Sequence, residues 1–166
     1  MSSSSIEVPD LTTERLVLRA WAAGEADAVV GGVRRSDWAD DFPAEGDQVI
    51  AGLLGEHPEW LDGYGHRLVV ERDSGLVVGS IGLFWPPADG VVEIGYGIVP
   101  SRRGRGYAAE ATRALTDHAL GATGVLAVHA EVELSNPASV RVLEKAGFRP
   151  LDGAAGQDTA RYGIVR

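Results

Sequence analysis

Short runs of apolar and β-branched residues, several of them alternating with polar residues, predict the β-strands of this chain. Within residues 11–21, Leu16 and Leu18 alternate with Arg15 and Arg19, as in a strand with one buried face. Similar runs bounded by turn residues predict six further strands, at 67–72, 77–85, 91–99, 125–132, 148–151 and 159–165. The turns Asp73-Ser74-Gly75 and 86–90 make the strands at 67–72, 77–85 and 91–99 an antiparallel meander, which Pro100 ends.

Four helices are expected between these strands, at residues 24–35, 48–61, from Gly104 or Arg105 to 120, and 136–147. The first is weakened by Gly31 and Gly32. The last has the start and stop signals of a helix, with Asn136 as N-cap, Pro137 in the first turn and Gly147 at the end. The acidic segment 37–47 separates the first two, and this irregular helical insert can wall a substrate pocket.

The order of these elements predicts a mixed α/β fold. A helix separates the strands at 91–99 and 125–132, so these two are expected to be parallel neighbours joined by a right-handed crossover. The remaining pairs are antiparallel, which gives a mostly antiparallel twisted sheet of about seven strands flanked by about four helices. With 166 residues, we expect a single domain over residues 11–166, preceded by a disordered lead-in over 1–10.

Composition removes several classes of function. The chain has no cysteine, which excludes disulfides and thiolate nucleophiles, and its four histidines show no paired metal spacing, so no metal is expected. A net charge of −9 argues against a nucleic-acid partner and suits a cationic substrate. No apolar run approaches the length of a membrane span and no signal pattern opens the chain, so a cytoplasmic protein without a membrane partner is expected.

The candidate chemistry is concentrated after the strand at 91–99. Arg102, Arg103 and Arg105 are interleaved with Gly104 and Gly106 directly before a helix start. Unpaired amides, the helix dipole and the arginines all favour an anion, and the glycines allow its close approach, so a phosphate or pyrophosphate is the expected ligand. The spacing matches neither a P-loop nor the Rossmann fingerprint.

Two motifs carry a resemblance to a known family. Arg103-Gly104-Arg105-Gly106-Tyr107-Ala108 resembles the Arg-x-x-Gly-x-Ala pyrophosphate loop of the GCN5-related N-acetyltransferases (GNAT), and NPASVRVLEKAGF at 136–148 is similar to a second signature of that superfamily. The segments TERLVLRAW and EIGYGIVPSRRGRGYAAEA resemble its ribosomal-protein N-acetyltransferase branch, the RimJ/RimL-like group. The resemblance covers residues 11 to about 162, with the insert 37–64 poorly matched.

The resemblance implies acetyl-CoA as cosubstrate and places it in the fold. In this family the two parallel strands splay apart and the pantetheine arm enters the gap, which puts Ile98 and Val99 along the arm. The amides of Arg103, Gly104, Arg105, Gly106, Tyr107 and Ala108 would surround the pyrophosphate. Gly95 and Gly97 suit a bulge or a close ligand, or simply relieve crowding against an aromatic ring.

Asn136 and Ser139 each have two interpretations. Asn136 either caps its helix or binds the pantetheine, and both can hold. Ser139 is either an ordinary first-turn serine or the acid that protonates the leaving thiolate. The tyrosine that many relatives carry further along this helix is missing, because Val142 and Leu143 stand there. That absence makes Ser139 the better candidate for the acid.

The implied reaction is direct attack of an amine on the thioester, which requires a base because alkyl amines are protonated at neutral pH. We expect Glu93 to be this base, since strand alternation places it on the face of Gly95 and Gly97. The alternative interpretation is that Glu93 is an ordinary surface carboxylate of the strand. The competing bases Glu131, Glu133 and His129 share one face of the next strand, and amides of residues 97–99 can hold the oxyanion.

The expected acceptor is a protein N-terminus or a small amine such as an amino acid, polyamine or antibiotic. The alternative function is a non-catalytic acetyl-CoA sensor or interaction module, and a homodimer is possible.

Overall fold

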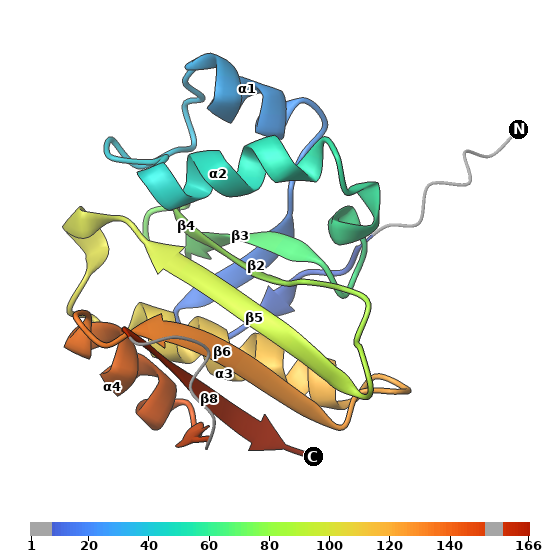
Figure 1. The fold of residues 1–166 in the computed structure, drawn as a ribbon. Helices are drawn as coiled ribbons and strands as arrows, with labels where there is room; N and C mark the ends of the chain where they lie inside the picture. Colours follow the sequence, from blue (N-terminus) through green and yellow to red (C-terminus); the bar gives the residue numbers. More distant parts are fainter. Residues whose placement is uncertain (1–7, 152–157) are drawn as a thin grey trace, which may run out of the picture.

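One eight-stranded sheet organises the protein in the computed structural model, which describes residues 8–151 and 158–166 (Figure 1). The strand order is β1-β2-β3-β4-β5-β6-β8-β7. The strands are β1 Leu11–Thr12, β2 Leu16–Ala20, β3 His66–Glu71, β4 Val77–Leu83, β5 Val91–Ile98, β6 Ala127–Glu133, β7 Arg149–Pro150 and β8 Thr159–Val165. All neighbouring pairs are antiparallel except β5 and β6. The mostly antiparallel sheet with one parallel pair is therefore confirmed.

The strand expected over residues 11–21 is instead a hairpin, which raises the strand count from about seven to eight. Thr13 reverses the chain, because its amide donates to the Leu16 carbonyl at 2.8 Å and its Oγ1 accepts from the Leu16 amide at 3.0 Å. β1 then pairs back onto β2, with Leu11 opposite Leu18. A side-chain hydrogen bond at Thr13 thus divides a run whose apolar alternation reads as continuous.

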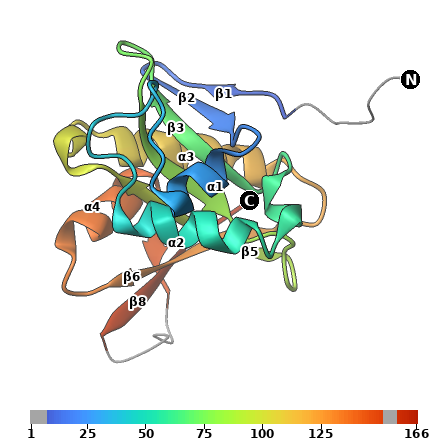
Figure 2. The same ribbon diagram turned by 90° about the horizontal axis from the view of Figure 1, so that it is seen from above.

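Helices cover both faces of the sheet (Figures 1 and 2). They are α1 Glu25–Gly31, α2 Glu45–Leu54, α3 Tyr107–Leu120 and α4 Pro137–Lys145, with short 3₁₀ turns η1 Pro58–Leu61 and η2 Pro100–Arg102. α1 is shorter than expected because Gly32, at φ 75°, ends it. The helix expected at 48–61 begins three residues earlier, at Glu45, and stops at Leu54, with η1 as a separate turn.

The parallel strands β5 and β6 separate along their length. Their pairing runs only from Val91 opposite Ala127 to Glu93 opposite His129, although β5 continues to Ile98 and β6 to Glu133. Figure 1 shows the two ribbons diverging toward their carboxyl ends. The unpaired part of this fork lies directly before the arginine- and glycine-rich loop, so the fold opens the sheet beside the predicted phosphate site.

Apolar side chains from the sheet and from the helices form a continuous core. Leu16, Leu18, Leu68 and Leu83 in the sheet are fully buried, as is Leu115 of α3. Removing side chains of this kind from water supplies most of the driving force for folding. Two parts of the chain fall outside the described residues: most of the expected lead-in, at 1–7, and most of the connection between the strands expected at 148–151 and 159–165, at 152–157. Among the described residues, no helix has the length and apolar character needed to cross a membrane.

Candidate active site

A groove of about 460 Å³ runs between the loop after β5 and helix α4. Its lining includes most of the residues predicted to bind acetyl-CoA: Ile98, Arg103, Gly104, Gly106, Tyr107, Ala108, Asn136 and Ser139. Val99 and Arg105 are absent from that lining. Val99 is fully buried and its amide donates to the Val78 carbonyl at 2.9 Å, which leaves this amide no free proton for a ligand.

The loop has the features expected of an anion cradle. Gly104 and Gly106 have φ angles of 80° and 82°, a region that other residues rarely adopt, and a Cβ on Gly104 would meet no atom within 4 Å. Gly106 is the N-cap of α3 and provides no side-chain acceptor, so the first-turn amides of the helix are not capped by this residue. Open space, bare amides and nearby guanidinium groups fit the pyrophosphate of acetyl-CoA.

The three loop arginines differ in role. Arg102 and Arg105 are paired with Glu71 at the end of β3, at 3.2 and 3.3 Å. The Nε of Arg103 donates to the Ile98 carbonyl at 2.9 Å, and the exposed Arg103 side chain lines the groove. Arg103 is therefore the loop guanidinium best placed to meet a phosphate, a distinction that the sequence does not reveal.

Glu71 holds the base of the loop in place. It is 4% exposed and accepts hydrogen bonds from Tyr107 Oη at 2.8 Å and Ser74 Oγ at 2.6 Å, in addition to its arginine partners. A second brace comes from Arg15, whose Nη1 donates to the Arg105 carbonyl at 2.7 Å while its Nε pairs with Glu110 at 2.7 Å. Sequence reasoning missed both braces, because each joins residues far apart in the chain.

Helix α4 presents Ser139 to the fork. Asn136 caps the helix, because its Oδ1 accepts from the Ser139 amide at 3.2 Å. Ser139 Oγ lies 2.7 Å from the hydroxyl of Tyr96 on β5, and either group can donate. Burial raises the pKa of Tyr96, although its hydrogen bond with Ser139 works in the opposite direction. Tyr96 of β5 thus brings a tyrosine hydroxyl to Ser139, the predicted acid, although helix α4 itself contains no tyrosine.

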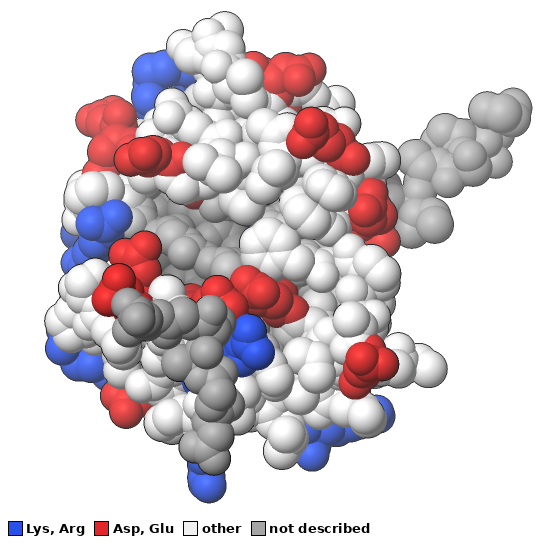
Figure 3. Space-filling model, in the orientation of Figure 1, with Lys and Arg blue, Asp and Glu red and all other residues white. Residues whose placement is uncertain are grey.

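A second cavity, of about 340 Å³, lies on the α2 side of β5. It shares Tyr96, Gly97, Ile98 and Arg103 with the groove, so one short stretch of β5 and the loop forms a wall of both. The rest of its lining comes from α2 and its N-cap Ala44, from β3 and β4, and from Gly95 of β5, and it includes Asp47. Figure 3 shows this face of the molecule hollowed at its centre, with acidic side chains along the edge of the hollow.

Gly95 and Gly97 of β5 have different surroundings. A Cβ on Gly95 would lie 3.2 Å from the ring of Phe84, so Gly95 relieves crowding against an aromatic side chain. A Cβ on Gly97 would meet nothing within 4 Å. Gly97 therefore borders open space at the place where the two cavities meet.

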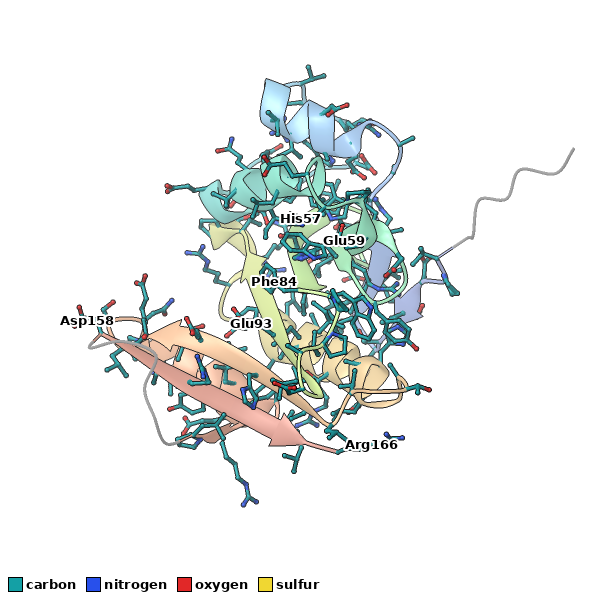
Figure 4. All side chains as sticks on the ribbon, turned by 45° about the vertical axis from the view of Figure 1, so that its right-hand side comes forward. His57, Glu59, Phe84, Glu93, Asp158 and Arg166 are labelled. Atoms are coloured by element: carbon teal, nitrogen blue, oxygen red, sulfur yellow. The ribbon has the colours of Figure 1, made fainter. Side chains whose placement is uncertain are left out.

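Glu93 lies at the base of the fork, in the last paired register of β5 and β6. It is exposed and absent from the lining of both cavities. Figure 4 shows it near Phe84, whose amide donates to the Glu93 carbonyl at 2.9 Å. Partial burial raises its pKa, and the carboxylate of Glu131 adds to the rise while Arg161 opposes it. Gly97 is four residues further along the strand, roughly 13 Å away at about 3.3 Å per residue.

Comparison with known proteins identifies the class. A family model described as "Acetyltransferase (GNAT) domain" matches residues 15–149. The chain therefore belongs to the GNAT family of acetyltransferases and is an N-acetyltransferase by class. Among the described residues, no group of three or more His, Cys, Asp or Glu is arranged to hold a metal ion.

Three similar proteins illustrate the relationship. The chain is 28% identical over 173 residues to the uncharacterized N-acetyltransferase YoaA of Bacillus subtilis, covering 95% of this chain and 97% of that protein. It is 34% identical to YjdG, another uncharacterized N-acetyltransferase of Bacillus subtilis, over 87 residues that make up only 52% of each protein. A solved structure of RimL, a ribosomal L7/L12 α-N-protein acetyltransferase in complex with coenzyme A, shares the fold with a TM-score of 0.69 at 18% identity, covering 95% of this chain and 98% of that one.

Proposed function

We propose that this protein transfers the acetyl group of acetyl-CoA directly to a primary amine, without a covalent enzyme intermediate. The observation that carries the proposal is the shared wall of the two cavities, formed by Tyr96, Gly97, Ile98 and Arg103. A donor in the groove and an acceptor in the cavity would meet across this wall. Holding two reactants in contact in this way removes much of the entropic cost of their reaction.

The chain's own residues would hold the cosubstrate, which supplies an activated acetyl thioester when bound. Arg103 and the amides around Gly104 and Gly106 would bind the pyrophosphate, and Ile98 would follow the pantetheine. Asn136 is engaged as the helix cap and also lines the groove, so its amide nitrogen remains available to a ligand. The position of each residue in the groove supports these assignments.

Two proton transfers complete the proposal. Ser139, hydrogen-bonded to Tyr96, would give a proton to the departing sulfur and would receive a proton from Tyr96, which would take one from water. Glu93 would accept the proton of the amine through a chain of water molecules, because its carboxylate lies outside both cavities and about 13 Å along the strand from Gly97. A raised pKa suits this role, since it makes the carboxylate a better base.

We assign the acceptor to the broad class of primary amines, either a protein N-terminus or a small molecule. The acidic edge of the hollow in Figure 3 favours a cationic acceptor. The RimJ/RimL-like motifs of the sequence support placing the chain in that branch.

A free-thiol assay with acetyl-CoA tests the proposal. We would present N-terminal peptides, free amino acids, polyamines and aminoglycosides in turn, and measure acetyl-CoA binding by calorimetry. Thiol release with one acceptor class would support the enzyme. Binding without release would favour a non-catalytic sensor, and the absence of binding would refute the proposed function.

The base is tested in the same assay with Glu93→Gln. We expect kcat to fall roughly 10²- to 10⁴-fold, as for the loss of a general base, and the acid limb of the pH profile to disappear. Glu56→Gln, at an exposed site, is the matched control. An unchanged kcat across pH in Glu93→Gln would exclude Glu93 as the base.

A further inference from the structure

The cavity on the α2 side contains a carboxylate without a cationic partner. Asp47, in the first turn of α2, is 3% exposed and lines the cavity. No ion pair within residues 8–151 and 158–166 involves it. The segments 1–7 and 152–157 contain no Lys or Arg. Because a buried carboxylate without a counter-charge is costly, Asp47 favours a ligand that brings a positive charge into the cavity.

Hydrogen bonds keep this carboxylate in one orientation. Its Oδ1 accepts from Ser80 Oγ, and its Oδ2 accepts from the Ala44 amide at 2.9 Å. Burial raises the pKa of Asp47, and these two hydrogen bonds oppose the rise. Each carboxylate oxygen can accept a further hydrogen bond, so Asp47 keeps capacity for a donor from the cavity.

Strand pairing places Asp47 next to the reaction centre. Its partner Ser80 on β4 lies directly opposite Gly97 on β5, so the two residues point to the same face of the sheet. Gly97 has no side chain to fill that face, and open space lies above it. The Asp47–Ser80 pair therefore borders the space next to the wall that the two cavities share.

His66 supplies a second unsatisfied group in the same cavity. It is 2% exposed, lines the cavity, and its Nε2 has no hydrogen-bond partner. Burial lowers its pKa to about 4, so the ring is neutral at pH 7 and places no positive charge beside Asp47. Arg103 also lines this cavity, but its Nε donates to the Ile98 carbonyl and, among the described residues, it forms no ion pair with Asp47. Much of the remaining lining is apolar or small, including Ile50, Ile81 and Gly95.

We propose that Asp47 is the anionic anchor of the acceptor and binds its protonated alkylamine group in this cavity. This inference rests on the proposed acetyl transfer and adds the specificity-determining residue. A compact alkylammonium group supplies the missing charge and donates hydrogen bonds, whereas a neutral hydroxyl offers no charge and a carboxylate repels Asp47. Asp47 thus selects cationic alkylamines and holds the nitrogen near Gly97, while the proton acceptor is a separate group.

The test is an NMR titration of the ¹⁵N-labelled protein, saturated with coenzyme A, using n-butylammonium chloride and the neutral isostere n-butanol. We expect wild type to bind n-butylammonium at least tenfold more tightly than n-butanol. Asp47→Asn should lose most of that preference, because Asn keeps the acceptor for the Ala44 amide but carries no charge. Asp40→Asn, at an exposed acidic residue of the same insert, should bind as wild type does.

Ser80→Ala is the control for a purely structural effect of Asp47→Asn. It removes a hydrogen bond but leaves the carboxylate, so we expect it to bind n-butylammonium within about threefold of wild type. Equal loss in Ser80→Ala and Asp47→Asn, or no preference for the ammonium in wild type, would overturn the inference.

Kinetics give an independent readout. With an alkylamine acceptor, Asp47→Asn should raise KM at least tenfold and change kcat far less. A loss of kcat at unchanged KM would overturn the anchor and make Asp47 the base. Coenzyme A binding, measured by calorimetry on the same samples, separates the two proposals. The absence of coenzyme A binding refutes the proposed function, whereas an alkylamine affinity that does not depend on the charge of Asp47 refutes only this inference.

Discussion

Replacing Glu71 by Gln perturbs the brace beneath the phosphate loop without changing its shape. Glu71 accepts hydrogen bonds from Tyr107, Ser74 and two arginines, and only 4% of its surface is exposed. Gln retains one oxygen acceptor but loses the charge. The effect on stability therefore isolates the charge-assisted part of the cluster.

The magnitude follows from the burial of each partner. A hydrogen bond to a charged group contributes roughly 1.5–3 kcal/mol and a neutral one roughly 0.5–1.5, so the bonds from Tyr107 and Ser74 each weaken by about 1 kcal/mol. The Arg102 side chain is 21% exposed and adds at most a similar amount, whereas the Arg105 side chain is 51% exposed and its ion pair contributes little in water. We expect a loss of about 2–3 kcal/mol.

Thermal unfolding at pH 7 measures this loss. In a chain of this size 1 kcal/mol corresponds to roughly 2–4 °C in Tm, so Glu71→Gln should melt about 5–10 °C below wild type. Tyr107→Phe, which removes one hydrogen bond, should fall in between, and the surface variant Glu56→Gln should match wild type. A Tm for Glu71→Gln within 1 °C of wild type would refute the reasoning.

The pH dependence has a definite sign. Burial alone would raise the pKa of Glu71, but the hydrogen bonds from Ser74, Tyr107 and Arg102 outweigh it and leave the pKa below the ordinary value of 4.5. A lowered folded-state pKa means that the stabilisation is present above the unfolded-state pKa and is lost as pH falls through the folded one. The Tm difference between wild type and Glu71→Gln should be complete at pH 7 and narrow below about pH 4.5.

Three further predictions concern turnover and binding. Ser139→Ala should lower kcat with little change in acetyl-CoA affinity, and Tyr96→Phe should lower it less; unchanged turnover in Ser139→Ala would reduce Ser139 to a helix-start residue. Gly106→Trp should abolish acetyl-CoA binding in calorimetry, because a side chain at φ 82° strains the loop and its Cβ would lie 3.3 Å from Nη2 of Arg15, which braces the loop; retained affinity would contradict the loop assignment. Gly97→Val should fold normally, since its Cβ has room, yet lose turnover; full activity would show that the shared wall is not the reaction centre.

Local signals predicted the parts of this fold that local chemistry determines. Asn136 and Pro137 begin α4 as their residue types require, and the strands at 67–72 and 77–85 form the expected hairpin. The parallel pair could be predicted from the intervening helix, because parallel neighbours need a crossover connection of a dozen or more residues, which is usually a helix. The glycine-rich loop was likewise identifiable, since its spacing and its place before a helix are both visible in the sequence.

The missed features all depend on contacts between distant residues. In the sequence Asp47 is one more acid of the segment 37–47 before an expected helix, and only the structure shows its hydrogen bond to Ser80, 33 residues away, and its place in a cavity. Tyr96 reads as a strand aromatic, although its hydroxyl meets Ser139 from 43 residues away. Helix and strand periods report which face of an element is buried, but not which side chains meet there.

The wall common to both cavities has a thermodynamic consequence. If donor and acceptor bind as proposed, the same stretch, Tyr96 to Ile98 with Arg103, borders both of them. Any coupling of the two affinities through this wall would be reciprocal: a factor by which coenzyme A tightens amine binding would be the factor by which the amine tightens coenzyme A binding. Each substrate would then act as an effector of the other, and a cell rich in the acceptor would load the protein with cosubstrate at a lower acetyl-CoA concentration.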